Sequence, residues 1–318
     1  MISRWNEDKK PNLIVILGPT ASGKTRLGAK LAEDMGSEII SADSRQVYRG
    51  MDIGTGKDLK EFIIDGKPVP YHLIDIIDPD YEFNVFEYQK RFFACFAEIT
   101  SRGIIPIMIG GSGLYIESAL RGYRMLEVPK NSALREKLET EKTETLTKRL
   151  IVLNPALHNT TDLKNKKRLI RAIEIALYTK NHSTKKVSIP RINPLIIGVR
   201  WDRKTLRQMI TTRLRKRLEM GMIDEARNLH ASGVSFEKLE FFGLEYRYIS
   251  LYLQNKLNKN DMFQKLSSNI HQFAKRQETW FRRMERQGFM IHWIDGADYV
   301  ALKKSVTNIL HPIPDKPE

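Results

Sequence analysis

The stretch GPTASGKT, from Gly18 to Thr25, decides the fold of this chain. The apolar run Pro11–Leu17 before it is typical of a strand that is buried on both faces of a parallel sheet. Apolar residues then recur at helical spacing from Leu27 to Met35 and stop at Gly36. A glycine-rich turn between a strand and a helix N-terminus points backbone amides at an anion. The sequence therefore predicts a phosphate-binding loop.

The parts of this loop have separate roles in holding a phosphate. Gly18 and Gly23 let the backbone approach the oxygens. Lys24 reaches them with its ammonium group, and the Thr25 hydroxyl can hold Mg²⁺. A chance match on an ordinary strand-to-helix turn is the alternative, and the length and the context of the pattern argue against it.

The composition favours a polyanionic partner. The 318 residues carry 53 Lys and Arg against 38 Asp and Glu, which leaves a net charge of +15 at pH 7. Such a surface attracts nucleic acid, whereas the alternative is a charge that only aids solubility. The one cysteine, Cys95, excludes a disulfide framework and has no partner spacing for a zinc site.

No membrane segment is expected. No basic, apolar and small-residue signal precedes the first strand, and no apolar run reaches the roughly 18 residues that span a bilayer. We therefore expect a soluble, cytoplasmic protein.

The pattern along the chain predicts an α/β fold. Further strands are expected at Glu38–Ile40, His72–Ile76, Ile104–Ile109, Pro194–Trp201 and Gly288–Ile294. Helical patterns separate most of them, which indicates a P-loop-type doubly wound parallel sheet. Residues 128–190 are dominated by charged helical patterns without a strand and are expected to form a helical insertion domain. Residues 1–127 would then form the first part of the core, and residues 191–318 its remainder with basic C-terminal helices.

The second expected strand leads into SADSRQVYRGMDIGTGKD, residues 41–58. Ligands of open α/β sheets bind beyond the carboxyl ends of the strands, so Asp43 is placed within reach of the phosphate loop. It can act as a metal ligand or a general base, and the alternative is a turn or cap residue. The glycine-punctuated loop after it carries Arg49, Thr55, Lys57 and Asp58, which favours a binding loop over a plain connection.

The strand at Ile104–Ile109 leads into GGSGLY, Gly110 to Tyr115. An ATPase usually has a metal-ordering carboxylate at such a strand end, and here glycines and a hydroxyl stand instead. This counts against an ordinary ATPase without excluding one, since Asp75 or Asp78 can take that role.

Three stretches concentrate positive charge: Lys164–Arg171, Arg203–Arg217 and His271–Gln287. Each alone is typical of a solvated helix face. Together, in a chain of this net charge, they favour a phosphate backbone as partner. Trp280 lies on the apolar side of its helical pattern, so a core position is favoured over base stacking.

Taken together, these motifs resemble the tRNA dimethylallyltransferase family, also called tRNA isopentenyltransferases, from about Leu13 to Trp293. The resemblance is carried by GPTASGKT, ISADSRQVYRGMDIGTGKD, GGSGLY, KRLIRAIEI and FAKRQETWFR. It implies transfer of the dimethylallyl group from dimethylallyl diphosphate to N6 of the adenosine immediately 3′ of the anticodon, in tRNAs reading codons that begin with U. Diphosphate would be released, Mg²⁺ would be the cofactor and the protein would be a monomer.

The resemblance also implies roles for single residues. Asp43 matches the general base, and Thr25 and Arg213 complete the catalytic set, with Thr25 as the metal ligand. The prenyl diphosphate would be bound by Gly18, Thr20, Ala21, Ser22, Gly23, Lys24, Thr25 and Arg213. The tRNA, with the target base flipped out of its stack, would contact Asp43, Ser44, Arg45, Gln46, Ser112, Lys167, Arg168, Leu169, Ile170, Arg171, Lys275 and Arg276.

Three departures from the family pattern are visible. GTGKD, residues 54–58, replaces the usual Gly-Thr-Ala-Lys-Pro, so that Gly56 stands for alanine and Asp58 for proline. Ser112 replaces a threonine and keeps the hydroxyl. The usual Ile-Gly-Tyr-Lys/Arg segment is FFGLEYRY, so either Gly243 is displaced or Glu245 replaces the glycine. A glutamate beside the RNA would repel phosphate, which suggests the hypothesis of an altered tRNA choice.

Two other functions compete with this reading. A P-loop kinase of a small metabolite would turn over ATP without RNA. A basic RNA-binding module with a structural loop would tolerate loss of the Asp43 carboxylate. The transferase instead predicts RNA binding that weakens steeply with salt.

Overall fold

The computed structural model describes residues 10–123, 125–154, 163, 165–182 and 189–311. The chain divides into two compact units: residues 1–122 with 190–318, and residues 123–189. The sequence placed the insertion at 128–190, within a few residues of the second unit. None of the helices in the described part of the chain is both long and apolar enough to cross a membrane.

The larger unit is built on a parallel sheet of six strands in the order β5-β2-β6-β1-β7-β8. The strands are β1 (Leu13–Leu17), β2 (Ile39–Ala42), β5 (Tyr71–His72), β6 (Ile107–Gly110), β7 (Pro194–Arg200) and β8 (Ile291–Asp295). Strand β1 lies between β6 and β7, and all five of its residues are buried. This order confirms the P-loop-type doubly wound sheet that the sequence predicts.

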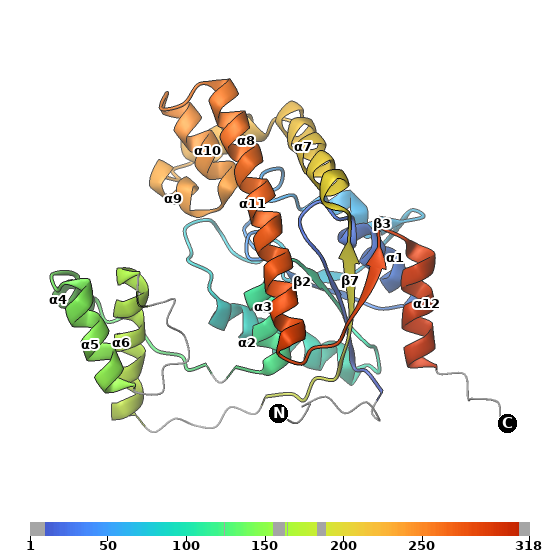
Figure 1. Ribbon diagram of the computed structural model, residues 1–318, viewed down its shortest axis with the longest axis horizontal. Helices are drawn as coiled ribbons and strands as arrows, with labels where there is room; N and C mark the ends of the chain where they lie inside the picture. The colour runs from blue at the N-terminus through green and yellow to red at the C-terminus, as the bar shows by residue number, and fades with distance from the viewer. Residues whose placement is uncertain (1–9, 124, 155–162, 164, 183–188, 312–318) are drawn as a thin grey trace. The chain divides into compact units, whose positions relative to one another are not determined.

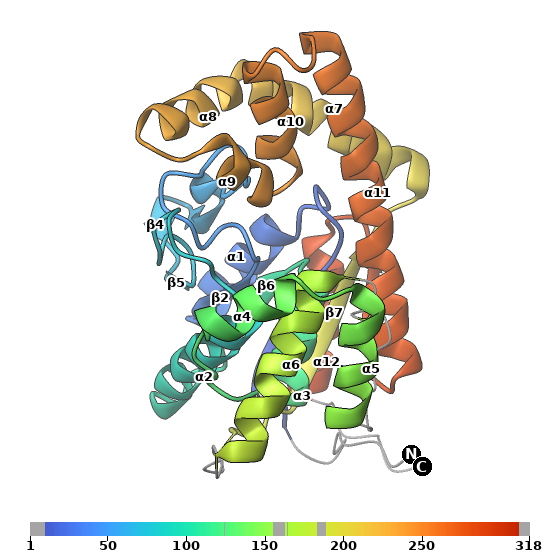
Figure 2. The ribbon, with the colours of Figure 1, turned by 90° about the vertical axis from the view of Figure 1, so that its left-hand side faces the viewer.

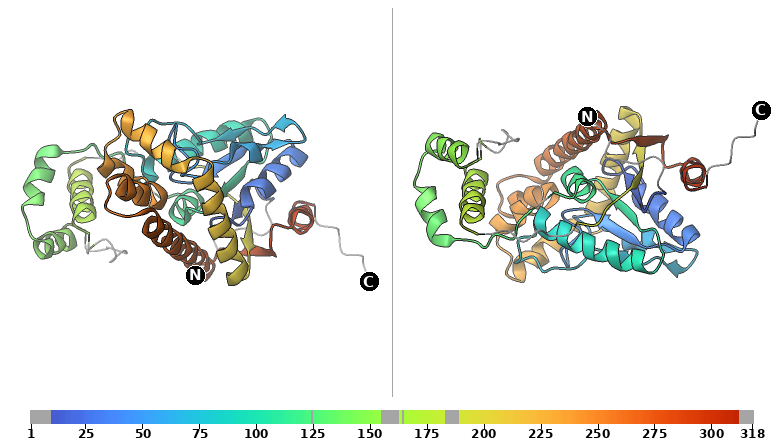
Figure 3. Two further views of the ribbon diagram at one scale, coloured as in Figure 1. Left: turned by 90° about the horizontal axis from the view of Figure 1, so that it is seen from above. Right: turned by 90° about the horizontal axis from the view of Figure 1, so that it is seen from below.

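Helices cover both faces of this sheet, as expected for a strand with no polar side. On one face Ile14 and Ile16 pack with α1 (Lys24–Met35) and α12 (Tyr299–Leu310). On the other face Leu13, Val15 and Leu17 belong to a second cluster, formed with α2 (Val85–Ser101), α3 (Gly113–Arg121) and α11 (Lys259–Arg286). Figure 3 shows α12 near α1, where Lys303 pairs with Asp34 at 2.7 Å.

The remaining helices of this unit gather beyond the carboxyl ends of the strands. They are α7 (Arg203–Glu219), α8 (Met222–Ala231), α9 (Phe236–Phe241) and α10 (Leu244–Leu253). Figures 1 and 2 show α8, α9 and α10 on this side of the sheet. The loop from β2 to β5 lies at the same edge and includes the short helix η1 (Leu59–Phe62) and the hairpin β3 (Ile63–Ile64) and β4 (Lys67–Pro68).

Several strands are shorter than the sequence predicts. The strand expected at His72–Ile76 is limited to Tyr71–His72, because Leu73 and Asp75 have left-handed backbone angles, φ 64° and 54°. The carboxylate of Asp75 instead pairs with the buried Lys57. The strand expected from Ile104 begins at Ile107, where pairing with β1 and β2 starts.

The smaller unit is a helical hairpin with a third helix and has its own core. It contains α4 (Ser132–Glu139), α5 (Thr143–Leu153) and α6 (Lys166–Asn181). Its core cluster is formed by the buried residues Leu138, Leu146, Leu150, Leu169, Ile170 and Ile173. Glu174 is buried beside this core and binds Arg135 and Arg171.

Candidate active site

A cavity of about 490 Å³ opens beyond the carboxyl ends of β1, β2 and β6 in the larger unit. The predicted residues that line it are Thr20, Ala21, Ser22, Gly23, Lys24, Thr25, Asp43, Ser44, Arg45, Gln46, Ser112 and Arg213. They come from segments up to about 190 positions apart in the sequence, since strand ends and α7 meet here. Gly18, Lys275 and Arg276 do not line this cavity.

The phosphate loop forms one wall of the cavity. Gly23, before α1, has φ 83°, and an added Cβ would lie 2.9 Å from the Ala297 side chain. At Gly18 a Cβ would lie 2.8 Å from Ser22 Oγ and 3.0 Å from the Val199 carbonyl oxygen. Both glycines are therefore required by the space around the loop.

Lys24 supplies the cation of this loop. Its ammonium group donates to the Pro19 carbonyl at 3.2 Å. Burial, followed by repulsion from Arg213, lowers the pKa of Lys24 to about 8. Burial and the nearby Arg213 disfavour the charged form of Lys24, and an anion bound in the loop would stabilise that form.

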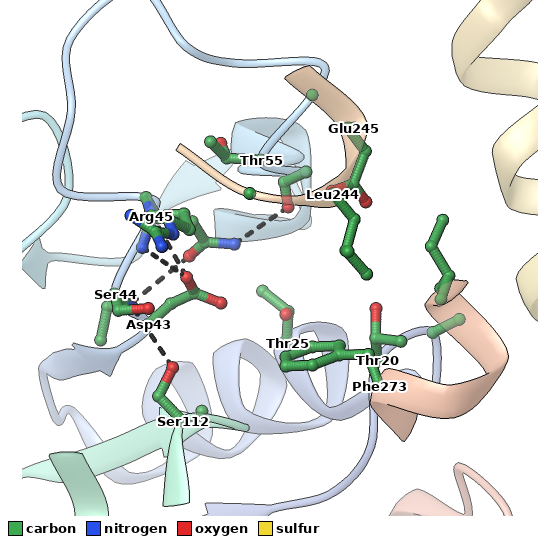
Figure 4. Close-up of a pocket in the computed structure, with 18 of the residues that line it drawn as sticks. Thr20, Thr25, Asp43, Ser44, Arg45, Thr55, Ser112, Leu244, Glu245 and Phe273 are labelled. Carbon is green, nitrogen blue, oxygen red and sulfur yellow. Dashed lines mark hydrogen bonds between the residues drawn. The ribbon is translucent and has the colours of Figure 1, made fainter. Parts of the chain in front are cut away.

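Asp43 follows β2 and faces Thr25 across the cavity (Figure 4). Its Oδ1 accepts from the backbone N–H of Arg45 at 2.8 Å and of Gln46 at 3.4 Å. Its Oδ2 has no hydrogen-bond partner among the described residues and points into the cavity. Asp43 thus acts as a turn residue through Oδ1, and its other carboxylate oxygen stays open to a ligand.

Hydrogen bonds fix the turn that carries Asp43. The Ser112 hydroxyl accepts from the Ser44 backbone N–H at 3.2 Å (Figure 4). The Gln46 side chain donates to the Gly56 carbonyl at 3.0 Å. The ends of β2 and β6 and the 54–56 loop are therefore tied together around the cavity.

Arg213 reaches the cavity from α7. Its Nη2 donates to Asp58 Oδ2 at 2.6 Å and lies 3.4 Å from the Gly56 carbonyl oxygen. Burial alone would raise the pKa of Asp58, but the charges of Arg213 and Arg217 lower it overall. The arginine predicted to bind diphosphate is thus close to the phosphate loop and is held by an acid.

Gln277 on α11 is a site residue that sequence analysis missed. Its Oε1 accepts from the Thr20 backbone N–H at 2.8 Å, and its Nε2 donates to the Gly111 carbonyl at 2.8 Å. The side chain is buried and links the phosphate loop to the end of β6. The only sequence signal was its place in the AKRQ motif, which was assigned to tRNA contact through its basic residues.

Glu225 on α8 was also missed. Its carboxylate accepts backbone N–H groups of Asp52, Ile53 and Gly54 at 2.7 to 2.9 Å, and the Tyr246 hydroxyl at 2.5 Å. It ties the 52–54 loop to α8 and α10. No local pattern points to it, because its backbone partners in the 52–54 loop lie more than 170 positions earlier in the chain.

The predicted tRNA contacts outside the cavity differ in exposure. Lys275 and Arg276 are exposed on α11, and Lys167 and Arg168 are exposed on α6. Leu169 and Ile170 are buried in the core of the smaller unit, and the Arg171 guanidinium binds Glu174 and the Val128 carbonyl. Lys164, the first residue of that basic stretch, lies outside the described residues.

Trp280 has the predicted core position. Its ring is partly buried against the main core cluster, and a Cβ on Gly113 would lie 2.3 Å from it. Arg283 lies over the ring at 4.9 Å from its centroid.

Known proteins resemble this chain over nearly its whole length. The IPP transferase family model matches residues 46–284, and an isopentenyl transferase model matches residues 11–66. The tRNA dimethylallyltransferase 1 of Syntrophus aciditrophicus is 60% identical over 296 residues, which cover 93% of this chain and 97% of that protein. The tRNA dimethylallyltransferase 1 of Geotalea uraniireducens is 59% identical over 285 residues, which cover 90% of this chain and 93% of that protein.

A solved structure agrees with these sequence matches. The full-length tRNA isopentenylpyrophosphate transferase of Bacillus halodurans is 31% identical and matches with a TM-score of 0.68 over 95% of this chain and 97% of that one. The resemblance that the motifs indicate is therefore confirmed over the whole fold. Because a family model spans most of the residues and close relatives match at nearly full length, the chain belongs to the tRNA dimethylallyltransferase (IPP transferase) family.

Proposed function

We propose that this chain transfers the dimethylallyl group of dimethylallyl diphosphate to N6 of the adenosine immediately 3′ of the anticodon, in tRNAs reading codons that begin with U. Diphosphate is the second product. The observation that carries the proposal is one cavity in which the phosphate loop faces the open carboxylate oxygen of Asp43. A leaving diphosphate and a proton acceptor are the two groups that this transfer needs.

The phosphate loop serves the leaving group. As the bond between the allylic carbon and the diphosphate oxygen breaks, positive charge develops on the carbon and negative charge on the oxygens. Loop residues, Lys24 and Arg213 line the cavity and would stabilise that negative charge.

A metal ion fits beside the same loop. No cluster of three or more His, Cys, Asp or Glu is present in the described part of the chain. Mg²⁺ does not require such a cluster, since it binds through one or two protein oxygens together with substrate phosphates and water. The Thr25 hydroxyl lines the cavity and would hold Mg²⁺, together with substrate phosphate oxygens and water. Bound there, Mg²⁺ would neutralise charge on the departing diphosphate.

Asp43 serves the nucleophile. The exocyclic N6 amine attacks the allylic carbon, the carbon–oxygen bond breaks, and one N6 proton passes to Asp43. The Arg45 and Gln46 amides orient Oδ1 and leave Oδ2 for that proton. A stacked adenine cannot reach this position, so the base must be flipped into the cavity.

The tRNA is expected to contact residues around and beyond the cavity. Ser44, Arg45, Gln46 and Ser112 would lie beside the flipped base, and exposed cations on α6 and α11 would contact the phosphate backbone. Leu169 and Ile170 would support the insertion from within its core. We further expect the protein to act as a monomer in the cytoplasm.

The kinase alternative has no support. The end of β6 presents Gly110, Gly111 and Ser112, and none of them can order a metal through a carboxylate. The relatives are named as tRNA-modifying transferases.

Substitution of Asp43 tests the proposal. With Mg²⁺, dimethylallyl diphosphate and an anticodon stem-loop, Asp43→Asn should lower the single-turnover rate by at least about 100-fold, because a general base acts in the transition state. The affinity for the stem-loop should stay within a few-fold.

A matched control is Asp65→Asn, which removes an exposed carboxylate in the β3–β4 turn. It should leave the transfer rate unchanged. Equal rates for Asp43→Asn and the unmodified protein, or a parallel loss of stem-loop binding and rate, would exclude the assigned role.

A further inference from the structure

Arg217 on α7 is a buried cation that the proposed reaction leaves without a task. It lies one helical turn after Arg213, is 8% exposed and lines the cavity. Its Nε and Nη2 have no hydrogen-bond partner among the described residues. Unsatisfied donors on a buried guanidinium are costly, so their presence points to a ligand that satisfies them.

The space around Arg217 is built from two of the departures from the family pattern. A Cβ at position 56 would lie 1.5 Å from Arg217 Nη2 and 2.4 Å from Cζ. Gly56 stands where the family usually has alanine, so the usual residue would displace this guanidinium. Gly56 also has φ 67°, a conformation that costs other residues energy.

Two acids lie near Arg217 but do not accept hydrogen bonds from it. Asp58, where the family usually has proline, lies 3.7 Å from Nη2 through its Oδ2. Glu245, from the altered FFGLEYRY segment, lies 4.0 Å from Nη1 through its Oε1. Both distances exceed hydrogen-bond length. The acids therefore offset the charge of Arg217 and leave its donors open.

The location of Glu245 indicates what the altered FFGLEYRY segment does. Figure 4 shows Glu245 and Leu244 on the opposite side of the cavity from Thr20 and Thr25. A smaller pocket is lined by Thr20, Ala21, Arg213, Arg217 and Glu245 among others. Glu245 thus faces a cation at the phosphate loop, which favours a role in the donor site over the altered tRNA choice suggested by the sequence.

Three cations converge on this part of the cavity. Lys24, Arg213 and Arg217 all line the cavity. Burial and the charge of Arg213 lower the pKa of Arg217. Mutual repulsion of this kind is relieved by a ligand that carries several negative charges close together, as a diphosphate does.

We propose that Arg217 is a second diphosphate-binding arginine, which Gly56 admits and which Asp58 and Glu245 hold in place. Arg217 then joins Lys24 and Arg213 as a third cation of the donor site. The inference rests on the proposed function, because it takes the ligand of the cavity to be a prenyl diphosphate.

Binding of inorganic diphosphate, measured calorimetrically with Mg²⁺, tests the inference without the transfer reaction. Arg217→Met removes the guanidinium and keeps an apolar stem, and it should weaken binding by about 10- to 100-fold, as expected for charged hydrogen bonds. Lys216→Met, on the same helix and exposed, is the matched loss of charge and should change the affinity less than about twofold.

Arg217→Lys gives a second test if Arg217→Met does not fold. It keeps the charge but lacks the planar fork, so its affinity should lie between those of the unmodified protein and Arg217→Met. An unchanged affinity in a folded Arg217→Lys or Arg217→Met variant would overturn this inference alone. If the unmodified protein bound no diphosphate, the proposed function would fail together with it.

Discussion

Burial lowers the pKa of Lys24 at the phosphate loop, so the charge of this residue depends on pH. Its pKa of about 8 means that the free protein loses this proton as the pH rises through 8. A bound diphosphate favours the charged form, so the proton is needed for tight binding. The affinity for the donor should therefore fall as the pH rises above about 8.

This coupling can be measured with inorganic diphosphate and Mg²⁺ between pH 6.5 and 9.5. The dissociation constant should rise by up to about tenfold per pH unit above pH 8. Lys24→Arg is the control, because its charge does not titrate in this range and the titration of the ligand itself is the same. Identical pH profiles for the two proteins would contradict the assigned role of Lys24.

The residues of the site divide into those that a local pattern reveals and those that it does not. The phosphate loop and Asp43 were predictable because each is decided by its neighbours along the chain and by the end of a strand. Gln277 and Glu225 were not, because the loops that they bind, at Thr20 and at residues 52–54, lie 257 and more than 170 positions away. Arg217 was visible only as one charge in a basic helix.

Among helices and strands, buried positions were the most predictable. Strand β1 is buried on both faces and stands out as an apolar run. Strand β5 was overestimated, because the apolar pattern continues after His72 whereas the backbone turns to bring Asp75 to Lys57. The turn places Asp75 in an ion pair with Lys57, a residue 18 positions earlier, which no local pattern reveals.

The smaller unit depends on one acid for its stability. Burial alone would raise the pKa of Glu174. Hydrogen bonds from the Arg135 side chain, the Asn131 backbone N–H and the Arg171 side chain instead lower it from 4.5 to about 2. Because the folded pKa is depressed, the stabilisation is complete above about pH 4.5 and is lost as the pH falls toward 2.

Glu174→Gln should therefore destabilise this unit at pH 7, since two arginines lose a buried partner. In the full chain, hydrogen exchange of the α6 amides should become faster by at least about tenfold, whereas the α1 amides should be unaffected. Glu139→Gln, an exposed acid on α4, is the control. Unchanged protection of α6 would show that this acid does not hold the unit together.

The molecule as a whole combines a nucleotide-type phosphate loop with the charge of a nucleic-acid binder. The net charge of +15 is carried in part by α7 and α11, which belong to the larger unit, and by α6 in the smaller one. A loop of this kind usually holds ATP, but the strand end beside it lacks the acid that an ATPase uses. Family membership and the Asp43 carboxylate instead favour a prenyl diphosphate.

The most direct test of this account is the mass of the nucleosides in an anticodon stem-loop after incubation with the purified protein, Mg²⁺ and dimethylallyl diphosphate. We predict one added five-carbon group on the adenosine 3′ of the anticodon and one diphosphate released per product. A stem-loop with guanosine at that position should remain unmodified. The account would be contradicted if no prenylated nucleoside formed and a small acceptor stimulated ATP hydrolysis. The phosphate loop would then bind ATP, as in a kinase.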